Sequence, residues 1–173
     1  MKMKSTLWVA LAVLAFSCSK NQPADPADKG TIGATLSAGL PFGASFRSTS
    51  PISQYAVRAN QQFEILAFAV NGKDSIQMDL TFPDTLSVNV PFNDPYGTLF
   101  MLQLFHMDRA TNTAENYTSY YCKAPSTTIT ITSWDKTAGK IAGSFSGKIA
   151  PVPPNDSITV TNGTFDTKYK TFP

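Results

Sequence analysis

A two-residue alternation of apolar and polar side chains runs through most of this chain, and it constrains the fold more than any other feature. The clearest case is residues 75–82, where Ile76, Met78, Leu80 and Phe82 share one predicted face. This period is that of a β-strand, because successive side chains of a strand point to opposite faces of a sheet. No stretch shows a sustained 3.6-residue period. The sequence therefore predicts an all-β fold.

The preceding segment, residues 62–70, has apolar side chains on both predicted faces. Phe63 and Ile65 lie on one face, and Leu66 and Phe68 lie on the other. This pattern indicates a central strand of a closed or sandwiched sheet, with both faces covered. Asn71-Gly72 follows directly, and this dipeptide is the strongest short sequence mark of a β-hairpin.

The rest of the chain continues in the same way, with short strands separated by turn residues. Further strands are predicted at residues 32–36, 44–47, 55–59, 86–90, 99–107 and 117–123, with a loop at 91–97. Residues 129–134, 140–149 and 157–165 predict a C-terminal antiparallel meander, with Ile131 and Phe145 inward and Thr130 outward. Regularly spaced short strands are typical of sandwiches and barrels. We expect one domain over residues 31–173, a single antiparallel β-sandwich, with a calycin-like β-barrel as the alternative.

The N-terminus resembles a bacterial lipoprotein signal. Lys2 and Lys4 precede an apolar run of about ten residues, shorter than the ~20 that span a membrane, and Ser17-Cys18 follows. The resemblance implies that Cys18 is lipidated and becomes the mature N-terminus. Residues 1–17 are then the signal peptide. Residues 18–30 are the lipidated cysteine and a tether, expected to be flexible because it contains no large apolar side chain.

Composition excludes several classes of function. Charged residues make up 15% of the chain and the net charge of +2 includes the lysines of the signal, so nucleic-acid binding has no electrostatic basis. Cys122 is the second of two cysteines and is expected to be a small buried side chain. His106 is the only histidine and is expected near a strand end, as neither ligand nor base. We therefore expect no metal site and no cofactor.

The C-terminal half resembles a family of Bacteroidota lipoproteins known only as a domain of unknown function. The resembling segments are Thr128–Asp135, Gly139–Gly147 and Ile158–Phe165, with inward Ile and Phe, outward Thr, and glycines at bends. The resemblance implies β architecture, lipid anchoring and export. It implies no activity.

Two sets of candidate site residues follow. Ser75, Thr85 and Ser157 each stand in an Asp-Ser/Thr-apolar triplet, and these triplets resemble the sites at which Bacteroidota glycosylate exported proteins. Tyr117 and Tyr121 lie two strand steps apart in the predicted strand 117–123, so they are expected on one exposed face, where they could stack a sugar or anchor a partner. The acids sit mostly at turns, and Gly143–Gly147 is no nucleophile elbow because its serines lie within a strand, so no catalytic residue is assigned.

These observations predict a lipid-anchored, non-enzymatic protein of the bacterial cell envelope, on the outer membrane, with a binding or structural role. The expected partners are the membrane, through the lipid, and a glycan or an envelope protein. One alternative is a small-ligand carrier, which would need an apolar interior cavity of several hundred Å3, on the order of ordinary ligand sites. The other is a glycan-active hydrolase, which would need carboxylates converging in a cleft. An exposed aromatic strip would favour the binding module.

Overall fold

The computed structural model describes residues 30–37, 40, 43–48, 54–59, 61–96, 99–122, 127–151 and 157–171. The predicted signal peptide, Cys18 and residues 19–29 lie outside the described residues. Within them the chain is almost entirely β, which confirms the predicted all-β class.

Strands follow one another along the chain with a single short 3-10 helix, η3 (Ser119–Tyr121), among the described elements. The strands are β1 (Thr31–Leu36), β2 (Ser45–Ser48), β3 (Gln54–Ala59), β4 (Gln62–Asn71), β5 (Asp74–Pro83), β6 (Phe92–Asp94), β7 (Met101–Asp108), β8 (Thr113–Thr118), β9 (Thr127–Asp135), β10 (Lys140–Pro151), β11 (Ile158–Lys168) and β12 (Lys170–Thr171).

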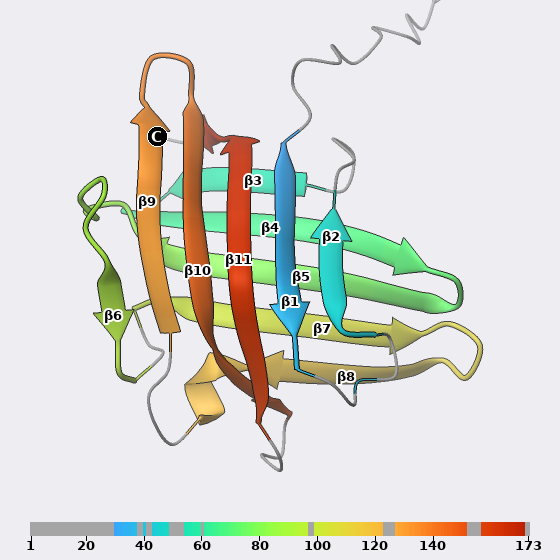
Figure 1. Ribbon diagram of the computed structural model, residues 1–173. Helices are drawn as coiled ribbons and strands as arrows, with labels where there is room; N and C mark the ends of the chain where they lie inside the picture. Colours follow the sequence, from blue (N-terminus) through green and yellow to red (C-terminus); the bar gives the residue numbers. More distant parts are fainter. Residues whose placement is uncertain are drawn as a thin grey trace, which may run out of the picture.

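The strands form two layers that run across each other (Figure 1). The first sheet has the order β2-β1-β11-β10-β9-β6, and the second has the order β12-β3-β4-β5-β7-β8. Strand β10 belongs to both, because its last residues, Ala150 and Pro151, pair with Thr118 and Tyr117 of β8. The packing is that of a sandwich, and the continuous hydrogen-bonded network nearly closes into a barrel. A strand that passes from one sheet to the other is typical of crossed sheet packings.

The predicted local features of the two clearest segments are present. Strands β4 and β5 form the Asn71-Gly72 hairpin, with Asn71 opposite Asp74 and Gly72 at a φ of +57°. A two-residue hairpin loop requires a positive φ at its first position, which glycine adopts without steric cost. The C-terminal meander β9-β10-β11 is antiparallel, as predicted.

The core lies between the two layers and is packed with large side chains. The largest fully buried ones are Phe46, Phe63, Phe82, Phe100, Ile32, Leu36, Ile65, Ile76, Met78, Leu80, Leu102 and Leu104. Ile131 and Phe145, predicted to face inward, are buried, and Thr130 between the buried positions of β9 is half-exposed. The predicted register of β9 and β10 is therefore confirmed.

Three sequence-based predictions of local structure are wrong. Residues 86–90 make only one isolated bridge, Val88 to Ile131, because Asn89 has a φ of +61° and turns the chain out of the extended conformation. The predicted loop 91–97 contains the short strand β6. The predicted strand 117–123 ends at Thr118, and the real strand, β8, begins at Thr113. Its first four residues are exposed and mostly polar, so they carry no apolar alternation.

The prediction that both faces of β4 are covered is also wrong. Phe63, Ile65 and Ala67 are buried against the other layer, but Phe68 and Val70 on the opposite face are exposed. The second sheet therefore keeps one face toward solvent, and this face carries large apolar side chains. That exposed face positions the candidate site.

Candidate functional site

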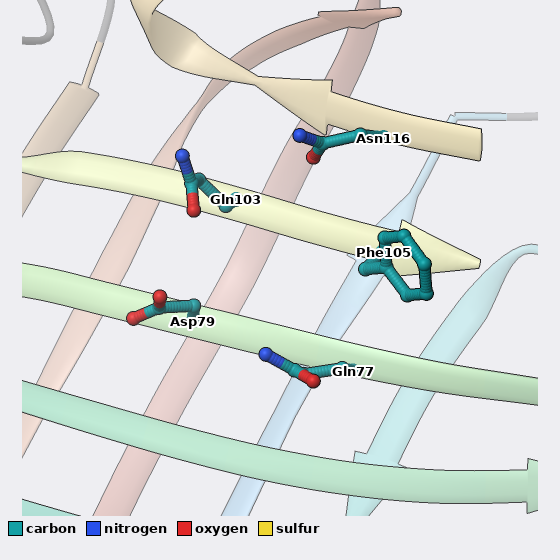
Figure 2. A pocket seen from close by; sticks show the side chains of 5 residues that line it. All are labelled: Gln77, Asp79, Gln103, Phe105 and Asn116. Carbon is teal, nitrogen blue, oxygen red and sulfur yellow. The ribbon is translucent and has the colours of Figure 1, made fainter. Parts of the chain in front are cut away.

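The solvent face of the second sheet carries a shallow groove with a volume of about 250 Å3. It is lined by Gln77 and Asp79 of β5, Gln103 and Phe105 of β7, and Asn116 of β8 (Figure 2). We call these five residues the outer groove.

Strand register brings these side chains together from three separate strands. Gln77 lies opposite Phe105, and Phe105 lies opposite Asn116 on the far strand. Asp79 lies opposite Gln103. Directly opposite residues in antiparallel strands have their side chains side by side on one face, so the five form two adjoining rows.

Apolar side chains of β4 extend these rows. Phe68 lies opposite Gln77, and Leu66 lies opposite Asp79. Phe68 is 39% exposed and Phe105 is 37% exposed, which is high for rings of this size in the middle of a sheet. One row therefore alternates exposed aromatic rings with amides, in the order Phe68, Gln77, Phe105 and Asn116, and the adjoining row contains Asp79 and Gln103.

The carboxyl group of Asp79 is held in an unfavourable setting for a charge. Burial raises its pKa to about 6, and the negative charge of Glu64 on β4 adds to the rise. The Thr81 hydroxyl donates to Asp79 Oδ1 at 3.4 Å, a long hydrogen bond that lowers the pKa only in part. Asp79 therefore accepts only one long hydrogen bond from the described residues, and its carboxyl oxygens can accept further hydrogen bonds from a ligand.

The three amides of the groove also have few partners within the protein. Gln103 Nε2 donates to Met101 Sδ at 3.3 Å, and thioether sulfur is a weak acceptor. The side chains of Gln77 and Asn116 make no hydrogen bond to any described residue. Each primary amide offers two donors and an acceptor, so the groove presents a dense set of open hydrogen-bonding sites.

A second polar cluster lies on the inner face, near the end of β7. His106 Nε2 lies 2.8 Å from Asp74 Oδ1, and both side chains are buried. His106 Nδ1 lies 3.7 Å from Glu115 Oε2, and the Tyr117 hydroxyl donates to the same oxygen at 2.6 Å. Burial, together with this bond to Glu115, raises the pKa of Tyr117. His106 lies near a strand end, as the sequence predicted, and the cluster joins β5, β7 and β8 internally.

The predicted pairing of Tyr117 and Tyr121 on one exposed strand face is wrong. Tyr117 is 7% exposed and faces the core, whereas Tyr121 is exposed in η3. The strand ends at Thr118, whose hydroxyl accepts from the Tyr120 backbone N–H, and the chain then turns. In this segment the exposed tyrosines are instead Tyr120 and Tyr121, whose rings meet edge to face at 5.2 Å.

The remaining candidate residues are placed as follows. Thr85 is exposed in the turn after β5, and Ser157 is exposed immediately before β11. Ser75 is half-buried as the second residue of β5, between β4 and β7. Glycosylation of these residues stays a prediction, and the lipidation site Cys18 lies outside the described residues.

Cys122 is half-buried, and burial raises the pKa of its thiol, which disfavours the reactive thiolate. Two of the turn acids bind backbone as expected: Asp94 accepts from the N–H groups of Leu99 and Phe100, and Asp135 accepts from that of Thr137. Among the residues that the structure describes, no group of three or more His, Cys, Asp or Glu side chains is placed to hold a metal ion.

Within the same part of the chain, no helix is long and apolar enough to cross a bilayer. Comparison of the chain with protein-family models, with curated proteins and with solved structures returned no match, so the groove has to be interpreted from its own chemistry.

Proposed function

We propose that this protein is a non-enzymatic binding module of a bacterial envelope, anchored by a lipid on Cys18, and that the outer groove is its ligand-binding surface. The observation that carries the proposal is the set of weakly satisfied polar side chains, Asp79 among them, beside the exposed rings of Phe68 and Phe105. Binding sites typically combine apolar and aromatic surface with a few polar groups that orient the ligand.

The packing of the interior favours this module over the small-ligand carrier. Phenylalanines from both sheets meet between the layers: Phe63 and Phe82 stack at 5.4 Å, and Phe82 lies 5.9 Å from Phe165. The two pockets that we describe, the outer groove and a shallow depression over β1, β2 and β11, both lie on outer faces. Both described pockets therefore offer space for a ligand on the outer surface of the sheets, and the space between the layers is filled by aromatic side chains.

The anchor is supported by sequence alone, through the basic start, the apolar run and Ser17-Cys18. We expect Cys18→Ala to leave the protein soluble or unprocessed, because it removes the only proposed acylation site. Partition into a detergent phase measures this directly. Equal partition of the variant and the parent would show that Cys18 is not the anchor.

Binding at the groove can be tested by NMR on the full-length chain in detergent micelles. The side-chain amide signals of Gln77, Gln103 and Asn116 report on the groove, and the signal of Asn162 on β11 reports on the opposite sheet. We expect the polysaccharide fraction or the protein fraction of the bacterial envelope to shift the three groove signals and leave Asn162 unchanged.

In the double variant Gln77→Ala/Gln103→Ala the remaining groove signal, that of Asn116, should no longer shift. The melting temperature should stay within a few degrees of the parent, since surface substitutions usually change stability by less than ~0.5 kcal/mol. Shifts that map to another face, or that persist in the double variant, would contradict the assignment of the groove as the binding surface.

A further inference from the structure

We infer that the ligand of the outer groove is an uncharged carbohydrate, with its hydroxyl groups donating to the Asp79 carboxylate and one sugar ring lying against Phe105. This inference rests on the proposed function and names the class of ligand. It follows from four properties of the groove: its hydrogen-bonding inventory, its exposed aromatic ring, its charge and its size.

The hydrogen-bonding inventory matches a sugar. A sugar presents hydroxyl groups that both donate and accept, at close spacing around a ring. The three amides both donate and accept, and ionised Asp79 accepts only. Gln77 and Asp79 alternate along β5, and Gln103 stands beside Asp79 on β7, so four polar side chains surround a small area of the sheet (Figure 2).

The aromatic component has a matching geometry. Phe105 sits between Gln77 and Asn116 in one row, and it is exposed enough to offer a ring face. The face of an aromatic ring carries partial negative charge and attracts the weakly positive C–H groups that a sugar presents on one side. Phe68, opposite Gln77 on β4, extends the same row.

The charge of the groove argues against an anionic ligand. None of its five lining residues is basic, and the charged residues at and beside it are Asp79 and Glu64. A phosphate or a uronic acid placed beside Asp79 would meet like charge in a partly desolvated setting, where repulsion is stronger than in water. An uncharged ligand avoids this repulsion.

The size of the groove argues against a protein partner. Its volume of about 250 Å3 suits one ring-sized unit. A stable protein–protein contact instead buries about 800 Å2 on each side. Asp79 places a carboxyl group in the groove, and the centre of a protein interface is typically depleted in charged residues.

Asp79 should make the affinity for the carbohydrate depend on pH. Hydroxyl groups that donate to Asp79 favour its carboxylate form, and its pKa is about 6 in the free protein. Affinity should therefore be full at pH 7.5 and fall as the pH drops through about 6. On β4, Leu66 lies directly opposite Asp79, and the charged Glu64 lies opposite Thr81, two residues along. The adjoining outward positions of β7 and β8 hold uncharged Gln103, Phe105 and Asn116. On β3, Tyr55 and Val57 stand opposite Leu66 and Glu64 in register.

The test is calorimetric titration of the full-length protein in detergent with two probes. One is a set of neutral oligosaccharides of glucose, galactose, mannose and N-acetylglucosamine, and the other is oligogalacturonate. We expect a neutral oligosaccharide to bind, with affinity that falls at least about fivefold from pH 7.5 to pH 5, as a charge-assisted hydrogen bond requires. Oligogalacturonate should not bind.

Three variants test the roles of individual side chains in sugar binding. Asp79→Asn should weaken binding of the neutral sugar about tenfold at pH 7.5 and abolish its pH dependence, because the amide neither ionises nor carries charge. Phe105→Ala should weaken binding severalfold at every pH, since ring stacking does not titrate. Thr164→Ala, on the exposed face of the other sheet, is the control and should bind as the parent does.

The outcomes separate this inference from the proposed function. If envelope proteins shift the groove signals and neutral sugars do not bind, the ligand class is wrong and the binding surface stands. If the anionic probe binds the parent more tightly than the neutral probes do, or if affinity is independent of pH, the inference is also overturned. If neither the envelope fractions nor the sugars engage the groove, the inference and the proposed function both fall.

Discussion

Gly163→Ala should lower the free energy of unfolding by about 3 kcal/mol or more, the upper range for forcing an extra methyl group into a packed core. A Cβ atom at position 163 would stand 2.4 Å from the Phe145 carbonyl oxygen and 2.6 Å from carbons of the Phe145 ring. Backbone atoms in the centre of a sheet cannot move aside without breaking ladder hydrogen bonds. Chemical denaturation monitored by circular dichroism measures the loss.

The arrangement behind this expectation is reciprocal. Gly163 of β11 lies opposite Phe145 of β10, and two residues along, Gly143 of β10 lies opposite Phe165 of β11. Each phenylalanine ring covers the glycine across from it, and a Cβ at Gly143 would stand 2.6 Å from the Phe165 ring. Packing of aromatic rings over glycines on neighbouring strands is a known way to stabilise a strand that contains glycine.

Gly33→Ala is the matched control for Gly163→Ala, because Gly33 is also a strand glycine and its added Cβ would meet only the Phe46 carbonyl oxygen at 3.4 Å. We expect the control to change stability by less than 1 kcal/mol, as sterically compatible glycine replacements do, at about 0.4–1 kcal/mol. Equal losses in the two variants would mean that the ring-over-glycine packing is not what excludes a side chain at position 163.

His106→Leu should destabilise the fold by roughly 1–3 kcal/mol or more, the cost of leaving a buried polar group without its hydrogen-bond partner. Leucine keeps much of the volume of the side chain but leaves the Asp74 carboxylate buried without its 2.8 Å partner. Glu115→Gln is the control, since Glu115 is 53% exposed and lies 3.7 Å from the imidazole, and its cost should stay below ~1 kcal/mol. Equilibrium urea unfolding at pH 7 measures both variants.

A second substitution separates lost hydrogen bonding from lost packing. Asp74→Asn removes the buried charge, so when added to His106→Leu it should recover part of the lost stability. If Asp74→Asn instead adds its full single-variant cost in that background, the two side chains act independently and the pair is not the source of the destabilisation.

Features that depend on neighbouring residues were predictable from the sequence. The inward face of β5 follows from alternation within ten residues, and the Asn71-Gly72 turn follows from the positive φ that glycine allows. The β9-β10-β11 meander connects strands that are adjacent in the chain. The predictions failed where the local sequence pattern does not reveal the tertiary contacts of a strand. In particular, the apolar outward face of β4 looked buried because sequence cannot show whether a second layer covers it.

The outer groove was not predictable, because its five residues are ordinary strand residues on three strands. Gln77 and Phe105 become neighbours only through the register of β5 with β7. Asn116 joins them through β8, which was not predicted as a strand at this position because its first residues show no apolar alternation. For Tyr117 and Tyr121 the sequence predicted a shared strand face that does not form, because the strand ends at Thr118 and Tyr121 lies in η3.

The all-β class, the hairpins between adjacent strands and the inward side of most strands follow from the amino-acid sequence, because each depends on the two-residue period and on turn residues a few positions apart. Tertiary structure alone decided which face of each sheet stays open to solvent, how β10 passes from one layer to the other, and which polar side chains meet in the outer groove. Those outcomes depend on pairing between strands far apart in the chain, and the free energy of that pairing comes from packing of the whole core.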